Sequence, residues 1–309
     1  MPAIRCENLT KRYGSVVALD NLNLEVPTHS VFGFLGPNGA GKTTTVKLLT
    51  GLAQPSTGQA WIDESTVGAP ELKERVSYLP DVPAFYNWMT GQEYLLFIAD
   101  LFHLGSASAK QRTAELLALV ELTGAGKRRV GGYSRGMRQR LGIAQALVNR
   151  PRVLFLDEPV SALDPIGRRD VLELILRLKE ETTVFMSTHI LSDVERVCDT
   201  VGIINKGRLV TVSSVAQLQA RYAPSVFEIE LEEDPANLIA AIEPQPWVIK
   251  AEKATDTQTP ILRVQVNNVS TAKKELLQII AASGVSILRY ELAMPSLEDI
   301  FLELVGGAS

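Results

Sequence analysis

The feature that most restricts the fold of this chain is a glycine-rich stretch at residues 36–43, GPNGAGKT. It matches the pattern G-x-x-x-x-G-K-[ST], with the apolar run VFGFL before it and KTTTVKLL after it. These flanks predict a strand, a turn and a helix whose N-terminus faces an anion. A chance glycine turn is the alternative, but it would not place a strand and a helix on either side. The segment therefore predicts an α/β fold that binds phosphate.

The chemistry of phosphate binding explains the residue types of this loop. Glycines allow the backbone to curl, so that successive N–H groups point at phosphate oxygens. We expect Lys42 to reach the β- and γ-phosphates of a nucleotide and Thr43 to offer its hydroxyl to Mg²⁺. The other residues expected at the nucleotide are Gly36, Pro37, Asn38, Gly39, Ala40, Gly41 and Thr44.

A second motif, VLFLDE at residues 153–158, is typical of a buried strand that ends in two acids. Such a strand can deliver the carboxylate of Asp157 to Mg²⁺. Glu158 follows at once and can polarise an attacking water as a general base. By itself the segment is also consistent with any buried strand before an exposed acidic turn. The phosphate loop upstream favours the catalytic interpretation.

A third segment, YSRGMRQR at residues 133–140, opens a predicted helix that runs through Leu147. Ser134 and Gly136 can bind an anion there through a hydroxyl, backbone N–H groups and the helix dipole. The alternative is a simple helix cap at Ser134, which would explain the serine but not its place in this series of motifs.

Three shorter features extend the series. Residues 161–164, SALD, follow the acidic pair, His189 follows the apolar run TVFMST, and Tyr13 lies early in KRYG. A histidine at a strand end can hold a γ-phosphate and respond to its loss, and an aromatic ring can stack on a base. Taken singly, His189 is more often structural and Tyr13 more often a packing residue.

Strand and helix patterns divide the chain into two predicted domains. In the first, short apolar strands alternate with helices, which indicates a mostly parallel sheet, and helical spacing predicts an inserted helical subdomain at about 85–150. A change of composition after Tyr222 predicts a small α+β domain, so the domains are residues 1–220 and 221–309. The predicted helices include residues 42–52 and 110–124, and the second domain is expected to hold strands at 226–231, 262–266 and 287–292 and helices at 271–283 and 297–305.

Composition excludes several classes of protein. A hydrophobic fraction of 46% with 21% charged residues indicates a packed core rather than a disordered chain. No run reaches the ~18 apolar residues of a membrane span, the start lacks the apolar core of a signal peptide, and two cysteines favour a reducing cytosol. The net charge of −4 argues against nucleic acid as a partner. Residues 222–309 hold six basic and thirteen acidic residues, so anion binding is expected in the first domain.

Taken in order, these motifs resemble those of the nucleotide-binding domain of an ABC transporter, over roughly residues 3–220. The series is Tyr13, GPNGAGKT, YSRGM, LFLDEP, SALD and His189. The resemblance implies a P-loop NTPase fold of the ABC type and a chain that hydrolyses ATP with Mg²⁺. It implies a homodimer that sandwiches two ATP molecules head-to-tail, with the phosphate loop of one copy facing YSRGM of the other. It also implies a separate integral membrane permease, reached from the cytoplasm at the inner face of the cell membrane.

The same resemblance assigns roles to individual residues. Tyr13 would stack on adenine, Asp157 would hold Mg²⁺, and Glu158 would be the general base. His189 would be the switch histidine, residues 161–164 would link the two ATP sites, and the serine and second glycine of YSRGM would touch phosphate.

Two positions differ from the usual pattern of the family. YSRGM replaces the usual LSGGQ, with Tyr133, Arg135 and Met137 as the changed residues. Asp81, in YLPD, stands where the family usually has a glutamine that contacts Mg²⁺ and water and relays the nucleotide state to the membrane partner. Asp81 is shorter and charged, and it is a candidate metal ligand.

The C-terminal segment narrows the transport function, and two other functions stay open. PSLEDIF at residues 295–301 is similar to the ending of drug, polysaccharide and lipid exporters, and of relatives that handle ions or help mature copper enzymes. This resemblance favours export. A soluble ATPase of the same superfamily, acting on ribosomes or DNA, would commonly carry tandem ATPase units or a long coiled-coil insertion. A small-molecule kinase with the same phosphate loop would leave YSRGM, SALD and His189 unexplained, and it would need an acceptor other than water.

Overall fold

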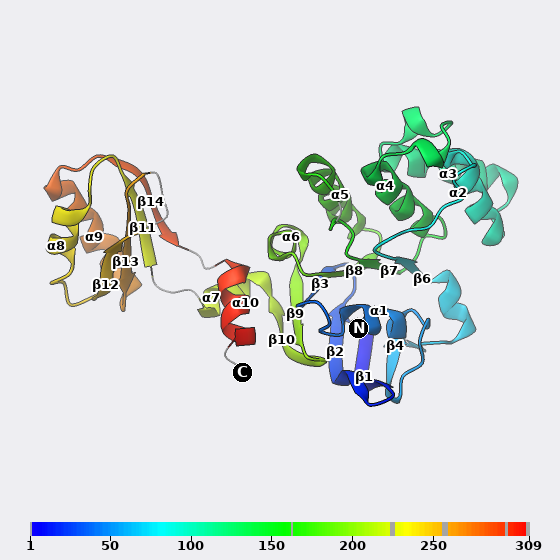
Figure 1. The fold of residues 1–309 in the computed structure, drawn as a ribbon, viewed down its shortest axis with the longest axis horizontal. Helices are drawn as coiled ribbons and strands as arrows, with labels where there is room; N and C mark the ends of the chain where they lie inside the picture. Colours follow the sequence, from blue (N-terminus) through cyan, green and yellow to red (C-terminus); the bar gives the residue numbers. More distant parts are fainter. Residues whose placement is uncertain (1, 162, 223–225, 255–258, 294–295, 307–309) are drawn as a thin grey trace. The chain divides into compact units, whose positions relative to one another are not determined.

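The computed structural model describes residues 2–306 apart from 162, 223–225, 255–258 and 294–295. These residues form two compact units, one up to Val215 and one from Ala216 onward (Figure 1). The predicted boundary at 220/221 falls inside α7 (Val215–Tyr222), because this helix continues through the change of composition. The predicted residues Ala162 and Pro295 lie outside the described part of the chain.

The first unit is built around a six-stranded sheet that is parallel except at one edge. Its order is β10-β9-β3-β8-β7-β6, and only the β10–β9 pair is antiparallel. The strands are β3 (Val31–Leu35), β6 (Val76–Leu79), β7 (Val153–Asp157), β8 (Thr183–Thr188), β9 (Thr200–Asn205) and β10 (Arg208–Ser214). Because parallel strands end at the same edge of a sheet, the segments after β3, β6, β7 and β8 lie along one edge, where α/β folds bind ligands.

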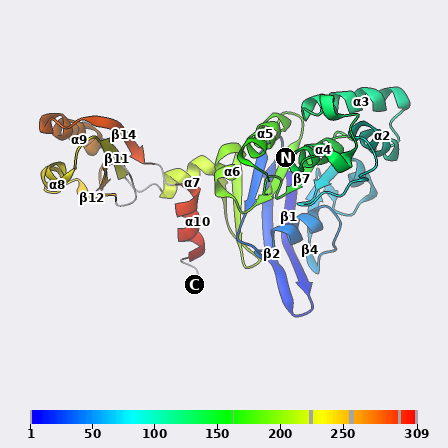
Figure 2. The same ribbon diagram turned by 45° about the horizontal axis from the view of Figure 1, so that its top comes forward.

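A second, antiparallel sheet of order β2-β1-β4-β5 covers one face of this core. It consists of β1 (Pro2–Tyr13), β2 (Val16–Pro27), β4 (Thr57–Ile62) and β5 (Ser65–Thr66). Its long β1–β2 hairpin is visible in Figure 2. α1 (Lys42–Leu49) contributes Val46 and Leu48 to a core cluster that also contains Leu22 of β2 and Phe34 of β3. The two sheets and α1 therefore hold the phosphate loop on a rigid base.

Three helices, α2, α3 and α4, pack on one another beyond β6 (Figure 1). Thr90 and Glu93 make a reciprocal capping box at the start of α2, in which Glu93 accepts from the backbone of Thr90 and donates its own N–H to the Thr90 hydroxyl. Besides α1, the helices of this unit include α2 (Gly91–Leu101), α3 (Ser106–Leu119), α4 (Arg135–Ala146), α5 (Pro165–Leu178) and α6 (Leu191–Val197), with 3₁₀ turns at Pro70–Glu74, Thr123–Ala125 and Val130–Gly132.

Two predicted helices have different ends in the structure. α1 ends at Leu49 rather than at residue 52, because Thr50 is its C-cap and Gly51 adopts a left-handed backbone with φ +73°. α3 begins at Ser106 and ends at Leu119 rather than spanning 110–124. Glu121 lies just beyond it with φ +57°, which no right-handed helix accommodates.

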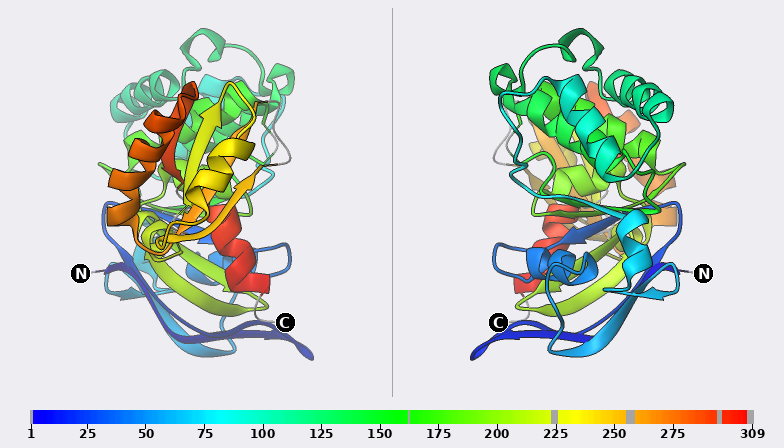
Figure 3. Two further views of the ribbon diagram at one scale, coloured as in Figure 1. Left: turned by 90° about the vertical axis from the view of Figure 1, so that its left-hand side faces the viewer. Right: turned by 90° about the vertical axis from the view of Figure 1, so that its right-hand side faces the viewer.

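The second unit is a split β-α-β-β-α-β arrangement with sheet order β12-β13-β11-β14. α8 packs on α9, as Figure 3 also shows, and Phe227, Ile229, Leu262 and Leu276 belong to the core beneath them. The elements are β11 (Val226–Leu231), α8 (Ala236–Ile242), β12 (Val248–Lys253), β13 (Ile261–Val266), α9 (Val269–Ser283), β14 (Ile287–Ala293) and α10 (Leu297–Gly306). The sequence-based prediction lacks β12 and α8 of this unit, and it also lacks β10 of the first unit. β12, VIKAEK, buries only Ala251, so it lacks a clear alternating apolar pattern.

Candidate nucleotide-binding and catalytic site

The phosphate loop joins the end of β3 to the start of α1, as the motif predicts. Gly39 and Gly41 have φ of +80° and +109°, which glycine adopts readily. A Cβ at Gly36 would lie 2.3 Å from the backbone oxygen of Ile204, and one at Gly41 would lie 2.6 Å from that of Ala18. The loop is therefore pressed against neighbouring backbone, and its shape depends on these glycines.

Lys42 folds back into the loop that precedes it. Its Nζ donates to the carbonyl oxygens of Gly36, at 2.8 Å, and Pro37, at 3.3 Å. The same atom lies 3.7 Å from Oε1 of Glu158, and only 7% of the Lys42 side chain is exposed. Burial lowers the pKa of Lys42, while the charges of Glu158 and Asp157 act in the opposite direction. The ammonium group therefore lies between the loop and the two acids at the end of β7, Asp157 and Glu158.

Asp157 is buried at the end of β7 and accepts hydrogen bonds from two hydroxyl groups. Thr43 Oγ1 donates to Asp157 Oδ1 at 3.4 Å, and Ser187 Oγ donates to the same oxygen. Ser187 is absent from the sequence-based prediction. Its signal was a polar residue directly after the apolar run at residues 184–186, and the β7–β8 register places it directly opposite Asp157.

Glu158 and His189 face each other from the ends of β7 and β8. His189 Nδ1 lies 2.9 Å from both Oε1 and Oε2 of Glu158. The backbone of Glu158 has φ +48°, in the left-handed region, and its N–H donates to Ser187 O at 2.9 Å. Such a conformation costs about 1–3 kcal/mol and persists where the surroundings enforce it. The strand end therefore holds the Glu158 carboxylate in a defined position.

Asp81 reaches the SALD segment. Ser161 Oγ donates to Asp81 Oδ1 at 3.1 Å, and it also lies 3.2 Å from the backbone oxygen of Glu158. Asp164 at the end of the segment caps α5, where its Oδ1 accepts from Gly167 N–H at 2.9 Å. The loops after β6 and β7 are therefore tied together beside Glu158.

Ser134, Gly136 and Tyr13 lie apart from this group. Ser134 Oγ caps α4 by accepting from Met137 N–H at 3.2 Å. Ser134 and Gly136 line a cleft of about 450 Å³ whose other wall includes Leu163 and Asp164. Tyr13 is 50% exposed, and Lys11 Nζ lies 4.9 Å from the centre of its ring. The structure of one chain thus brings Lys42 and Thr43 close to the acids at the end of β7, and His189 close to Glu158. It does not bring Tyr13, Ser134 or Gly136 into this group.

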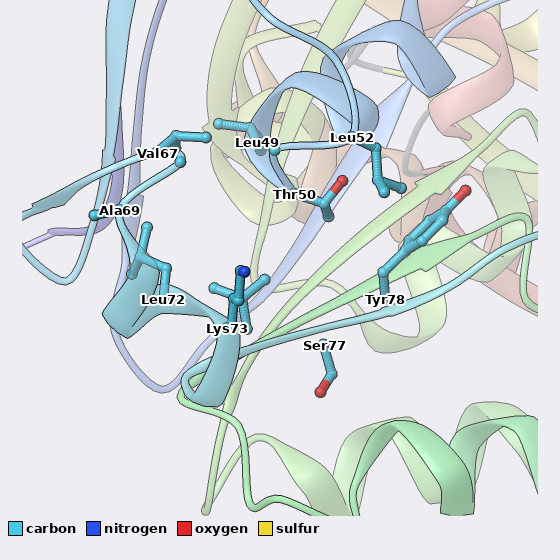
Figure 4. A pocket seen from close by; sticks show the side chains of 12 residues that line it. Leu49, Thr50, Leu52, Val67, Ala69, Leu72, Lys73, Ser77 and Tyr78 are labelled. Atoms are coloured by element: carbon cyan, nitrogen blue, oxygen red, sulfur yellow. The ribbon is translucent and has the colours of Figure 1, made fainter. Parts of the chain in front are cut away.

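A further cavity of about 260 Å³ opens at the C-terminal end of α1 (Figure 4). Tyr78 of β6 forms part of its wall together with Leu52 and Thr50. Burial, together with the negative charge of Asp157, raises the pKa of Tyr78 to about 12. Tyr78 is a second residue of this region that the motifs did not indicate.

The comparisons with known proteins agree with these observations. The family model described as ABC transporter matches residues 19–161. The chain is 38% identical over 300 residues to the ABC transporter ATP-binding protein YxlF of Bacillus subtilis, covering 97% of this chain and 98% of the relative. The chain belongs to the ABC transporter ATP-binding proteins. It is accordingly an ATP-binding subunit of an ABC transporter and an ATPase, which hydrolyses ATP to ADP and phosphate.

Other relatives of this ABC subunit extend over its whole length. It is 36% identical to the bacitracin transport ATP-binding protein BcrA of Bacillus licheniformis, over 99% of this chain and 98% of that one. It is 34% identical to the daunorubicin resistance ATP-binding protein DrrA2 of Streptomyces coeruleorubidus, over 98% and 95%. A second model, for the C-terminal domain of DrrA1-3-like ATP-binding proteins, matches residues 214–305.

Solved structures confirm the P-loop NTPase fold of the ABC ATPase. The structure of cbiO1 from Clostridium perfringens, part of the ABC transporter complex cbiONQ, has a TM-score of 0.66 and 25% identity, over 71% of this chain and 91% of that one. An ATP-binding subunit of another ABC transporter gives a TM-score of 0.64 at 27% identity, over 71% and 93%. Within the described residues, no helix is long and apolar enough to cross a membrane.

Proposed function

We propose that this subunit binds and hydrolyses Mg-ATP at a head-to-tail homodimer interface and thereby drives export through a separate membrane permease. The observation that carries the proposal is the convergence of Lys42, Asp157, Glu158 and His189 at the ends of β3, β7 and β8. Phosphoryl transfer to water uses a lysine that binds phosphate, a metal-binding carboxylate and a base that orients the water. The site offers Lys42, a carboxylate beside a hydroxyl, and a second carboxylate beside a histidine.

The phosphate loop and Lys42 would hold the β- and γ-phosphates. Backbone N–H groups of the loop and the N-terminus of α1 provide fixed positive potential. Lys42 now donates to the loop carbonyls of Gly36 and Pro37. Exchanging these carbonyls for phosphate oxygens retains its hydrogen bonds and pairs its charge, so Lys42 is suited to neutralise charge on the γ-phosphoryl group.

Thr43 and Asp157 have the chemistry of a Mg²⁺ site. Their oxygens lie 3.4 Å apart, and hydroxyl and carboxylate oxygens are the donors that Mg²⁺ accepts together with substrate phosphates. When bound there, Mg²⁺ supplies positive charge that stabilises the transferring phosphoryl group. Asp81 is proposed as a further ligand, although its carboxylate contacts Ser161 in the structure. Reaching the metal would require Asp81 to leave that hydroxyl.

Glu158 is the proposed general base. Its carboxylate is mostly buried between Lys42 Nζ and His189 Nδ1. A carboxylate in this position can accept a hydrogen bond from water and orient it for in-line attack. His189 holds the carboxylate through Nδ1, and its side chain is 46% exposed, which leaves it accessible to a γ-phosphate. Loss of that phosphate on hydrolysis would release His189 and the loops beside it.

A second copy of the chain is proposed to complete each site. Ser134 and Gly136 line a cleft away from the phosphate loop of their own chain, so they are available to a nucleotide held by another copy. The α4 N-terminus adds a favourable dipole for an anion. The exposed ring of Tyr13 is proposed to stack on adenine. A similar cassette, MJ0796, has been solved as a dimer bound to ADP and phosphate.

The surface beyond Asp81 is the proposed contact with the permease. An aromatic patch formed by Phe85, Tyr86, Trp88 and Phe97 starts four residues after Asp81, and Trp88 is 66% exposed. Exposed apolar patches of this kind mark protein interfaces. Export is proposed because BcrA and DrrA2 are named for bacitracin transport and daunorubicin resistance. The subunit would act in the cytoplasm, at the inner face of the cell membrane.

The test is the recovery of partners by tagged Glu158→Gln protein from detergent-solubilised membranes, with and without Mg-ATP. We expect a multi-spanning membrane protein in near one-to-one ratio, and less of it when Trp88→Ala is added. Recovery of ribosomes or DNA-repair proteins with no membrane protein would instead support the soluble ATPase. A matched sample with Trp61→Ala, on β4, controls for the loss of a tryptophan.

A further inference from the structure

We propose that the Ser161 hydroxyl switches between two acceptors, and that it thereby couples the turn at Glu158 to the segment after β6 that begins near Asp81. The proposal rests on the roles proposed for Glu158 as the general base and for the surface beyond Asp81 as the permease contact. It makes Ser161 a positioning residue, which acts on the permease-facing segment through the side chain of Asp81.

The hydroxyl of Ser161 has one hydrogen and two acceptors at nearly equal distances. Its Oγ lies 3.1 Å from Asp81 Oδ1 and 3.2 Å from the backbone oxygen of Glu158. A carboxylate and a carbonyl oxygen only accept, so Ser161 is the donor in both contacts. One O–H cannot point straight at both oxygens, and hydrogen bonds weaken steeply away from a linear geometry. A small movement of either oxygen therefore decides which contact the hydroxyl keeps.

The acceptor on the catalytic side belongs to a turn that Glu158 begins. The backbone N–H of Ser161 also donates to the Glu158 oxygen, at 3.4 Å, which closes residues 158–161 into a turn. The carboxylate of Glu158 lies between Lys42 and His189. Nucleotide phosphates at Lys42 would add negative charge beside this carboxylate. Movement of the Glu158 backbone in response changes the distance from its carbonyl oxygen to the Ser161 hydroxyl.

The acceptor on the other side stands at the start of a segment without regular secondary structure. β6 ends at Leu79, and Pro80 has no N–H with which to extend the pairing to β7. Among the hydrogen bonds of the described residues, the contact of Asp81 with Ser161 is the one that ties residues 80–85 to another segment. Loss of this contact therefore frees the start of the segment.

The far end of the same segment is held by an aromatic contact. Phe85 meets Tyr94 of α2 edge to face, with ring centres 5.2 Å apart. Between this contact and Asp81, the side chain of Val82 is 81% exposed. Phe85 belongs to the aromatic patch proposed as the permease contact, so a movement that begins at Asp81 reaches the patch along the chain. The Ser161 hydroxyl thus controls the end of the segment that lies beside the catalytic site.

The first experiment places a fluorine probe beside Asp81. Both native thiols, Cys6 and Cys198, are buried, so Val82→Cys offers an accessible thiol for a trifluoromethyl label. Without nucleotide, Ser161→Ala should shift the ¹⁹F resonance, and Ser161→Thr, which keeps a hydroxyl, should leave it in place. In an Asp81→Ala background Ser161→Ala should have no further effect, because the contact is already lost. An equal shift in both backgrounds would overturn the proposal.

A second measurement tests the coupling to the catalytic site with the same probe at residue 82. A non-hydrolysable ATP analogue with Mg²⁺ is added to saturation, and its occupancy is measured by calorimetry. The analogue should shift the resonance, and Ser161→Ala should remove more than half of that shift at equal occupancy. The same label on Ile249→Cys, at an exposed position of β12, is the control and should not respond. No shift in the labelled parent, or an equal shift in Ser161→Ala, would overturn the switch.

These outcomes separate the switch from the proposed function. Failure of the analogue to bind would count against the proposed ATP site, whereas the nucleotide-free comparison would still decide whether Ser161 holds Asp81. Binding without any effect of Ser161→Ala would leave the ATP site in place and exclude the coupling.

Discussion

His189 Nδ1 lies 2.9 Å from both carboxylate oxygens of Glu158, although 31 residues separate the two in sequence. Nδ1–H donates to the carboxylate in the tautomer that this contact favours, which leaves Nε2 to face outward. On its other side, Glu158 lies 3.7 Å from Lys42 Nζ. The carboxylate is therefore held between two nitrogen donors at the mouth of the phosphate loop.

This arrangement predicts that Glu158→Gln retains ATP but loses turnover. The amide keeps the shape of the side chain and cannot accept a proton, so phosphate release should fall by about 10²–10⁴-fold, the usual range for loss of a general base. ATP affinity measured by calorimetry should stay within a few-fold. Glu180→Gln, at an exposed position of the same chain, is the control. Normal phosphate release by Glu158→Gln would exclude Glu158 as the base.

Lys42→Ala should lose ATP affinity. The ammonium is the one charged group that donates directly to the carbonyls of the phosphate loop among the described residues, and its loss leaves the γ-phosphate without its positive partner. We expect at least a tenfold higher dissociation constant, which is about 1.4 kcal/mol. Lys47→Ala, on an exposed position of α1, should bind ATP normally. Equal affinities for the two variants would contradict the role given to Lys42.

The helix after SALD and the helix after His189 are joined by an ion pair. Arg168 Nε of α5 lies 2.6 Å from Asp193 Oδ1 of α6, and the Asp193 side chain is 2% exposed. Removing one partner of a buried pair typically costs about 3–5 kcal/mol, and the partial exposure of Arg168 favours the lower end. Arg168→Ala should therefore lower the free energy of unfolding by about 3 kcal/mol in urea titrations, whereas Arg169→Ala should change it little.

The same variant should also change the pH dependence of stability. Burial raises the pKa of Asp193, and Arg168 opposes that effect. Without Arg168 the folded state holds the Asp193 proton more tightly than the unfolded state does. Stability of Arg168→Ala should therefore decline as pH rises above about 4, more steeply than in the unmodified protein. Parallel pH profiles for the two proteins would show that the pair does not control this ionisation.

Gly41→Ala should disrupt the phosphate loop. Its φ of +109° is unfavourable for alanine, and the new Cβ would lie 2.6 Å from the backbone oxygen of Ala18. A strained residue of this type costs about 1–3 kcal/mol, and relief of the clash would move the loop amides away from phosphate. We expect a lower melting temperature and at least tenfold weaker ATP binding. Gly105→Ala, where the Cβ meets nothing within 4 Å, is the control, and equal behaviour of the two would refute the argument.

The sequence alone was sufficient for the phosphate loop, the acidic strand end and the overall α/β class. These features are local, because glycine positions, apolar runs and the residues that follow them are contiguous in the chain. VFGFL became β3, KTTTVKLL became α1, and VLFLD became β7. Helix ends were less predictable. Gly51 and Glu121 end their helices through left-handed backbone conformations, with φ of +73° and +57°.

Contacts between distant segments were decided only by the tertiary structure. Ser187 faces Asp157 because β8 pairs with β7 in a particular register, and Tyr78 lies opposite Phe155 because β6 pairs with the other side of β7. Neither residue carries a motif, since its role depends on strand order rather than on its neighbours in sequence. The sequence thus predicted which groups would do the chemistry, because those groups stand in contiguous motifs, and the order of the parallel strands decided which other side chains lie beside them.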